Sequence, residues 1–173
     1  MPLFSASSFP VTVGLIGHGA IGSVVAEAIL DSTHGLRADR VLLKAVLVRR
    51  PRNEGDSLEK NTAKPKVLIT NKAEDFFASG PFDVVIEASG QQTVRDHFAR
   101  MLVEGTSVIC TSIGALTDDK LRVELEQAAI KGNSQLLLAS GAMPALDWMH
   151  SSAIDFAASQ SVTAIQKKPP ESW

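Results

Sequence analysis

Short apolar runs rich in β-branched residues recur along the first 139 residues, separated by longer segments in which apolar residues follow helical spacing. Runs of about four to eight such residues are typical of buried strands. The pattern predicts strands at residues 11–16, 41–48, 66–70, 83–88, 107–111 and 135–139. The polar segment 49–64 predicts an exposed loop.

The segments between these runs predict helices. Residues 20–30 are small and apolar and contain no proline, which suits a helix packed on a sheet. Segment 93–103 places four apolar side chains at helical spacing: Val94, Phe98, Met101 and Leu102. A further helix is expected to begin at residues 117–119, where an N-cap and the carboxylates of Asp118 and Asp119 favour its positive end, and to be followed by Gly132 in a left-handed conformation.

Strands that alternate with helices predict a parallel sheet covered on both faces, and right-handed crossovers favour a doubly wound α/β arrangement. We expect this domain to span residues 1–144. Residues 145–173 would then form a connecting helix, near 145–159, and the first strand, near 162–165, of an incomplete second α+β domain. The apolar face of the expected connecting helix would normally pack against the rest of that second domain. Exposed, such a contiguous apolar face predicts self-association, so a homo-oligomer is expected.

Composition narrows the class of protein. The chain is 45% hydrophobic and 21% charged, with a net charge of −2, so no basic excess points to nucleic acid. No apolar run reaches the roughly 18 residues of a membrane span, and the N-terminus lacks a signal peptide, so a cytoplasmic protein is expected. The single cysteine, Cys110, excludes an internal disulfide and a cysteine zinc cluster, and no histidine pair has metal-ligand spacing, so no metal site is expected.

A glycine fingerprint carries the first functional signal. Gly17-His18-Gly19-Ala20-Ile21-Gly22 matches G-x-G-x-x-G between a predicted strand and a predicted helix. In this context Gly17 allows the tight turn, Gly19 admits a pyrophosphate, and Gly22 lets the helix pack against the strand. Free N–H groups at the helix start then bind the phosphates, which predicts a dinucleotide site. The alternative is a purely structural glycine turn.

The end of the second predicted strand bears on cofactor choice. An acid that binds the ribose hydroxyls is usual there, but this strand is followed by Arg49 and Arg50. Arginine forms charge-assisted hydrogen bonds to phosphate, so NADP is favoured over NAD. The alternative is a solvated basic loop.

Three later strand ends place small and hydroxyl-bearing residues at the same sheet edge, in segments 87–90, 111–116 and 140–147. A flat nicotinamide ring needs close backbone approach of this kind. The candidates are Ala88, Ser89, Gly90, Ser112, Gly114 and Ala115. Small residues that merely pack well at a sheet edge are the alternative. Glu87 ends its strand at this edge, where a buried acid commonly accepts hydrogen bonds from the next loop.

The order of the fingerprint, Glu-Ala-Ser-Gly, Thr-Ser-Ile-Gly-Ala-Leu, Ser-Gly-Ala and the closing Lys168-Pro169-Pro170-Glu171-Ser172-Trp173 resembles the L-aspartate dehydrogenase family. The resemblance implies a Rossmann NAD(P)-binding domain, with Ala115 at the alanine that contacts the cofactor. It also implies oxidation of L-aspartate by NAD or NADP to iminoaspartate, which hydrolyses to oxaloacetate and ammonia or feeds pyridine nucleotide biosynthesis.

The chain departs from that family in length, because members are longer by about a hundred residues. Their catalytic histidine is expected beyond Trp173, so no catalytic residue is assigned and weak or no turnover is expected. Among the histidines present, His18 is expected beside the pyrophosphate, and His150 is the one weighed for a catalytic role because its predicted helix starts near the site. The alternatives are a non-catalytic NAD(P)-binding module or fragment, and another two-domain dehydrogenase of the homoserine dehydrogenase or dihydrodipicolinate reductase type, against which the Lys-Pro-Pro-x-x-Trp ending argues.

Overall fold

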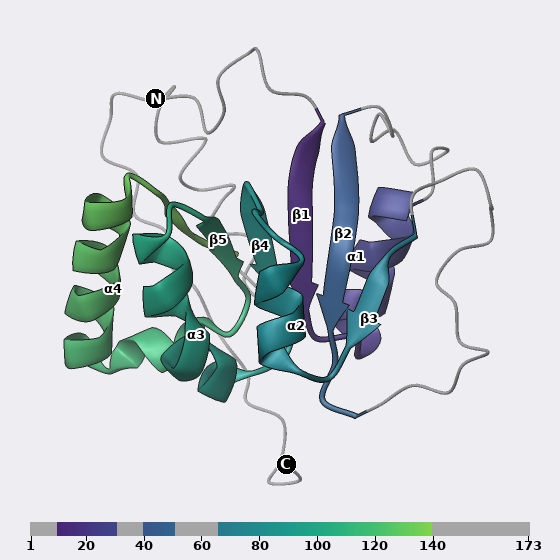
Figure 1. The fold of residues 1–173 in the computed structure, drawn as a ribbon. Coiled ribbons are helices and arrows are strands. Elements are labelled where there is room, and N and C mark those ends of the chain that lie inside the picture. Colours follow the sequence, from purple (N-terminus) through teal and green to yellow (C-terminus); the bar gives the residue numbers. More distant parts are fainter. Residues whose placement is uncertain (1–9, 31–39, 51–65, 140–173) are drawn as a thin grey trace, which may run out of the picture. The chain divides into compact units, whose positions relative to one another are not determined.

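The computed structural model of the chain describes residues 10–30, 40–50 and 66–139. These residues form a twisted sheet with helices on its faces (Figure 1). Several predicted features lie outside the described residues: His34, most of the loop 49–64, the helix and strand expected after residue 144, His150, and the Lys-Pro-Pro-x-x-Trp segment. The predicted domain boundary therefore stays a prediction.

The sheet is parallel throughout and has the strand order β3-β2-β1-β4-β5-β6. The strands are β1 (Val11–Ile16), β2 (Val41–Leu47), β3 (Leu68–Thr70), β4 (Val84–Glu87), β5 (Ser107–Cys110) and β6 (Leu136–Leu138). All of the strands expected from the apolar runs are present, with ends that differ by one or two residues. The order reverses between β1 and β4, which confirms the doubly wound α/β prediction.

Two apolar clusters cover the two faces of the sheet. One is built on α1 (Ala20–Leu30), whose Ala26 and Ile29 pack with strand residues that include Leu15. The other is built on α2 (Ala73–Ala78), α3 (Gln91–Val103) and α4 (Asp119–Gly132). Burial of these apolar faces, rather than helix propensity, holds the short segments in place. A short 3₁₀ turn, η1 (Ile113–Thr117), connects β5 to α4.

The helix α3 follows its predicted pattern. The four side chains at helical spacing, Val94, Phe98, Met101 and Leu102, are all buried. The helix begins two residues earlier than expected, at Gln91, directly after Gly90. Its start therefore lies next to the loop that follows β4.

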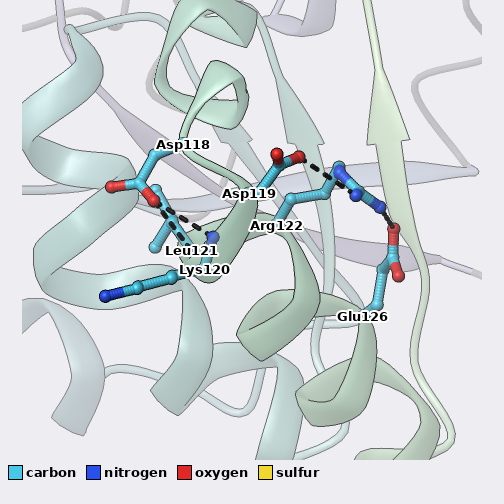
Figure 2. A network of polar contacts seen from close by, with 6 residues as sticks. All are labelled: Asp118, Asp119, Lys120, Leu121, Arg122 and Glu126. Carbon is cyan, nitrogen blue, oxygen red and sulfur yellow. Dashed lines mark hydrogen bonds and ion pairs between the residues drawn. The ribbon is translucent and has the colours of Figure 1, made fainter.

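The helix α4 begins as predicted and ends one residue later than predicted. Asp118 is the N-cap, and its carboxylate accepts hydrogen bonds from the backbone N–H groups of Lys120 (3.1 Å) and Leu121 (3.3 Å) (Figure 2). Arg122 then pairs with Asp119 and Glu126 along the exposed face (Figure 2).

The end of α4 corrects the role expected of Gly132. Gly132 is the last helical residue, and the left-handed position belongs to Asn133, with a φ of 50°. The glycine is needed for packing, because a Cβ there would collide with the carbonyl oxygen of Leu102 in α3. Asparagine tolerates the left-handed conformation, so the helix can end one residue later.

Candidate cofactor site

The loops after β1 and β4 diverge at the carboxyl edge of the sheet. Ile16, the last residue of β1, lies in register with Glu87, the last residue of β4. After Ile16 the chain leads to α1 on one face, and after Glu87 it leads to α3 on the other. In open parallel sheets ligands bind at such a switch point, outside the carboxyl ends of the strands.

The first half of the site is the turn from β1 into α1. Gly17 has a φ of 98°, a left-handed conformation that favours glycine, and its N–H donates to the carbonyl of Leu47 at 2.8 Å. A Cβ on Gly17 would collide with the carbonyl of Ala88 in the loop after β4. The two loops of the switch point are therefore in backbone contact.

The other two glycines of the fingerprint differ sharply in their surroundings. A Cβ on Gly22 would collide with the carbonyl oxygen of Gly17, so this glycine lets α1 fold directly onto the turn. A Cβ on Gly19 would meet nothing within 4 Å. Packing within the described residues therefore explains Gly17 and Gly22 but leaves the space beside Gly19 open to another molecule.

The start of α1 has the electrostatic character of an anion site. The first N–H groups of a helix have no partner within it, and the helix dipole places positive charge there. The first turn of α1 contains no acidic residue that would offset this charge. His18 is half-buried in the turn, and Ala20 and Ile21 are exposed. These residues fit a diphosphate, whose oxygens need N–H donors and a close backbone approach.

The arginines lie at the carboxyl end of β2, on the other side of the glycine turn. Both Arg49 and Arg50 are exposed, directly after buried Val48. The N–H of Val48 donates to the carbonyl of Thr70, so the edge of the sheet is well defined up to this point. The structure thus places both arginines at the carboxyl edge of the sheet, where the sequence predicts the cofactor. They follow β2, the strand that pairs with β1.

Glu87 is fully buried and accepts hydrogen bonds from both loops that follow the central strands. From the loop after β4, the N–H groups of Ser89 (2.7 Å) and Gly90 (2.8 Å) donate to its Oε1. From the loop after β5, the N–H groups of Thr111 (3.2 Å) and Ser112 (2.9 Å) donate to its Oε2. The hydroxyls of Ser89 (3.0 Å) and Ser112 (2.9 Å) complete the set at Oε1.

These hydrogen bonds set the charge of Glu87. Burial alone would raise the pKa of its carboxyl, but the backbone N–H groups of Ser89, Ser112 and Gly90 and the Ser112 hydroxyl outweigh it and lower the pKa below the ordinary value. Glu87 is therefore ionised at neutral pH. The sequence indicated contact with the next loop; the structure adds the loop after β5.

Cys110 lies beside this carboxylate at the end of β5. Its Sγ is 4.0 Å from Oε2 of Glu87, and the side chain is fully buried. Burial and the nearby negative charge raise the pKa of the thiol to about 11. The thiol is therefore protonated at neutral pH, and the side chain packs as a small buried apolar group.

The remaining candidates lie in the same two loops. Ser89 is exposed, and Ala88, Gly90, Ser112 and Gly114 are half-buried. Ala115 is fully buried within η1, and its contact with a cofactor stays a prediction. The structure thus gathers the candidates from four strand ends, those of β1, β2, β4 and β5, along one edge of the sheet, whereas the predicted segment 140–147 lies outside the described residues.

Two residues at the start of α3 belong to this edge but were not among the candidates. The Thr93 hydroxyl is 2.7 Å from that of Ser89, and the side-chain nitrogen of Gln91 would be 2.7 Å from a Cβ on Gly114. The four-residue spacing of Ser89 and Thr93 at a helix start is the signal that could have indicated the first contact.

Residues 10–30, 40–50 and 66–139 contain neither a candidate metal site nor a candidate membrane span. No group of three or more histidine, cysteine, aspartate or glutamate side chains is placed to hold a metal ion there. No helix in these segments is both long and apolar enough to cross a membrane.

The strand order, the glycine turn and the switch point define a Rossmann-type dinucleotide-binding domain. More particularly, the chain belongs to the family described as "Homoserine dehydrogenase, NAD binding domain", which it matches over residues 17–139. The match covers the fingerprint and every strand after β1.

Curated relatives confirm the resemblance seen in the sequence. The chain is 34% identical over 158 residues to an L-aspartate dehydrogenase of Methanosarcina mazei, covering 91% of this chain and 54% of the relative. It is 30% identical over 161 residues to an L-aspartate dehydrogenase of Ralstonia nicotianae, covering 93% of this chain and 56% of the relative. The chain therefore spans little more than half the length of these relatives.

Solved structures share the fold. Aspartate dehydrogenase from Thermotoga maritima superposes with a TM-score of 0.54 at 20% identity, over 82% of this chain and 50% of that one. A biliverdin reductase from Synechocystis in complex with biliverdin and NADP+ gives 0.56 at 20% identity, over 75% and 37%. GenD2 from gentamicin A biosynthesis in complex with NAD gives 0.59 at 22% identity, over 80% and 37%. The family match, whose description names an NAD binding domain, supports a nicotinamide cofactor.

Proposed function

We propose that this chain is the cofactor-binding part of an L-aspartate dehydrogenase-like oxidoreductase. The observation that carries the proposal is the likeness to relatives named L-aspartate dehydrogenase over more than nine tenths of the chain. The proposed reaction oxidises L-aspartate at Cα to iminoaspartate, which hydrolyses to oxaloacetate and ammonia. The bound nicotinamide supplies the hydride acceptor, and the protein supplies binding and orientation.

The glycine turn holds the diphosphate in this proposal. Backbone N–H groups of residues 18–22 at the start of α1 donate to its oxygens, and the open space at Gly19 admits it. Gly17 and Gly22 keep the turn pressed against the loop after β4 and against α1. Ala88, Ser89, Gly90, Ser112, Gly114 and Ala115 then line the side of the nicotinamide.

Arg49 and Arg50 are proposed to favour NADP over NAD. Both are exposed at the end of β2, where an acid would serve the ribose hydroxyls of NAD. Their guanidinium groups bind a 2′-phosphate through charge-assisted hydrogen bonds of about 1.5–3 kcal/mol each.

The first experiment is an isothermal titration of the whole chain with NADPH and with NADH. Micromolar affinity with NADPH preferred supports both the cofactor site and the arginine assignment. Replacing Arg49 and Arg50 together by Glu should weaken NADPH binding about a hundredfold, because each 1.4 kcal/mol is a factor of ten. NADH lacks the 2′-phosphate and serves as the internal control, since its affinity should change little. Equal losses for the two cofactors would contradict the arginine assignment.

A glycine pair tests the diphosphate subsite separately. Gly19→Val fills the open space beside the turn, so it should abolish binding of both cofactors without lowering the thermal midpoint. Gly22→Val should lower the midpoint itself, because its side chain meets the Gly17 carbonyl. If a folded Gly19→Val variant kept its cofactor affinity, the assignment of the diphosphate to this turn would be contradicted.

Substrate is tested by the rate of NADPH formation with L-aspartate. We expect weak or no turnover from this chain, and a homo-oligomer is proposed because the sequence predicts a contiguous exposed apolar face. L-Homoserine is the second substrate to compare, because the matched family is described by homoserine dehydrogenase. A rate with homoserine that exceeds the rate with aspartate would favour that second function. Tight cofactor binding with no turnover of any amino acid would favour a non-catalytic NAD(P)-binding module.

A further inference from the structure

Glu87 ends the central strand β4 and lies wholly inside the protein, yet it carries a negative charge. A buried charge is costly unless hydrogen bonds compensate it. The donors that compensate this one come from two separate segments, each of which follows a different strand. The side chain is therefore a bridge between loops that the sheet itself does not connect.

The bridge is built mainly from backbone donors. Ser89 and Gly90 donate their N–H groups from the loop after β4, and Thr111 and Ser112 donate theirs from the loop after β5. A carboxylate can accept all of these bonds at once because its two oxygens only accept. No neutral side chain of the same shape can do so, because glutamine replaces one oxygen by a second donor.

We propose that Glu87 is a positioning residue that fixes the segments 88–90 and 111–114 as one wall, against which the nicotinamide half of the dinucleotide lies. This inference rests on the proposed cofactor function and deepens it. Glu87 acts through the two loops, because it is fully buried and both of its oxygens are occupied by the chain's own donors. It is therefore not a catalytic residue.

The topology assigns the wall to the nicotinamide half. In a doubly wound sheet a dinucleotide lies across the switch point, with one mononucleotide over each half of the sheet. The arginines at the end of β2 suit the adenosine half, which leaves the side of β4 and β5 to the nicotinamide. The Glu87 bonds all lie on that side, whereas the Gly19 turn lies at the boundary.

The test uses Glu87→Gln and two ligands. NADPH carries the nicotinamide. The second ligand, 2′-phospho-ADP-ribose, retains the diphosphate and the 2′-phosphate but has no nicotinamide. Glutamine turns a donor toward N–H groups of one loop, so that loop is released. We expect the Kd for NADPH to rise about tenfold or more, as loss of one hydrogen bond to a charged group would predict, and the Kd for 2′-phospho-ADP-ribose to stay within about twofold.

Asp83→Asn is the matched control, because it makes the same chemical change at the opposite end of the same strand. The Asp83 carboxylate accepts hydrogen bonds from the N–H and hydroxyl of Thr12, both at 2.6 Å, and lies at the amino edge of the sheet. This variant should lower the unfolding midpoint and leave both Kd values unchanged. Glu87→Asp is the second Glu87 variant, since it keeps the charge but is one methylene too short to reach both loops, and it should show the same selective loss.

The outcomes separate the inference from the proposed function. Selective loss of NADPH affinity in either folded Glu87 variant supports the inference. Equal loss of affinity for both ligands, or no loss for either, overturns the inference. In that case the affinity of the wild-type chain still supports the cofactor function. If the wild-type chain binds neither ligand, the proposed function fails and the inference fails with it.

Discussion

Replacement of Gly17 by alanine should destabilise the chain through two separate effects. The φ of 98° at this position costs an alanine about 1–2 kcal/mol, because a Cβ is crowded in the left-handed conformation. The new Cβ would also stand 2.6 Å from the carbonyl carbon of Ala88 and 2.9 Å from the Cα of Ser89. Overpacking of this kind costs about 1–3 kcal/mol, so the expected total loss is about 2–5 kcal/mol.

The assay is urea unfolding monitored by circular dichroism. The unfolding midpoints are compared between variants that have the same dependence of unfolding free energy on urea concentration. Gly19→Ala is the control, because its Cβ would meet nothing within 4 Å and it should stay within about 0.5 kcal/mol of wild type. The reasoning is refuted if Gly17→Ala unfolds at the wild-type midpoint, or if both alanine variants lose the same stability.

Three further outcomes are expected. Asp118→Ala should cost about 1 kcal/mol in urea unfolding, because two N–H groups of α4 lose their cap, and Asp119→Ala, which caps nothing, should cost less. Cys110 should resist a thiol reagent at neutral pH until urea unfolds the chain, since its pKa is raised to about 11; rapid labelling of the folded chain would contradict its burial. The lowered pKa of Glu87 means that its ionised form stabilises the fold fully above the ordinary pKa of 4.5, and that this stabilisation is lost as the pH falls through the lower pKa of the native state. The difference in unfolding free energy between wild type and Glu87→Gln should therefore narrow on acidification. A difference that stays constant with pH would contradict an ionised Glu87.

The sequence predicted the sheet well because each strand is a short apolar run. The inner strands β1, β2, β4 and β5 are largely buried, whereas the edge strands β3 and β6 are only partly buried. It did not predict α2, whose six residues are too few to form a stable helix alone. That helix exists because Phe76 is fully buried and stacks on Phe82, with ring centroids 4.9 Å apart. A contact of this kind depends on tertiary packing, which periodicity does not reveal.

The candidate site was predictable in its positions but not in its connections. The glycine spacing and the strand ends indicate which residues gather at the carboxyl edge. The double bridge of Glu87 depends on the register of β4 with β5, in which Glu87 lies opposite Cys110. The exchange of roles between Gly132 and Asn133 depends on how closely α4 approaches Leu102. Neither the register of the two strands nor the approach of the two helices can be read from the local sequence pattern of one segment.

The close approach of Gly132 to Leu102 has a mechanical consequence. It joins the far ends of α3 and α4 backbone to backbone, while Glu87 joins the loops that lead into the same two helices. The segment from β4 to α4 is thus fastened at both edges of the sheet. Because Glu87 ties the two loops together, a displacement of one loop would also move the other, and with it the start of the second helix.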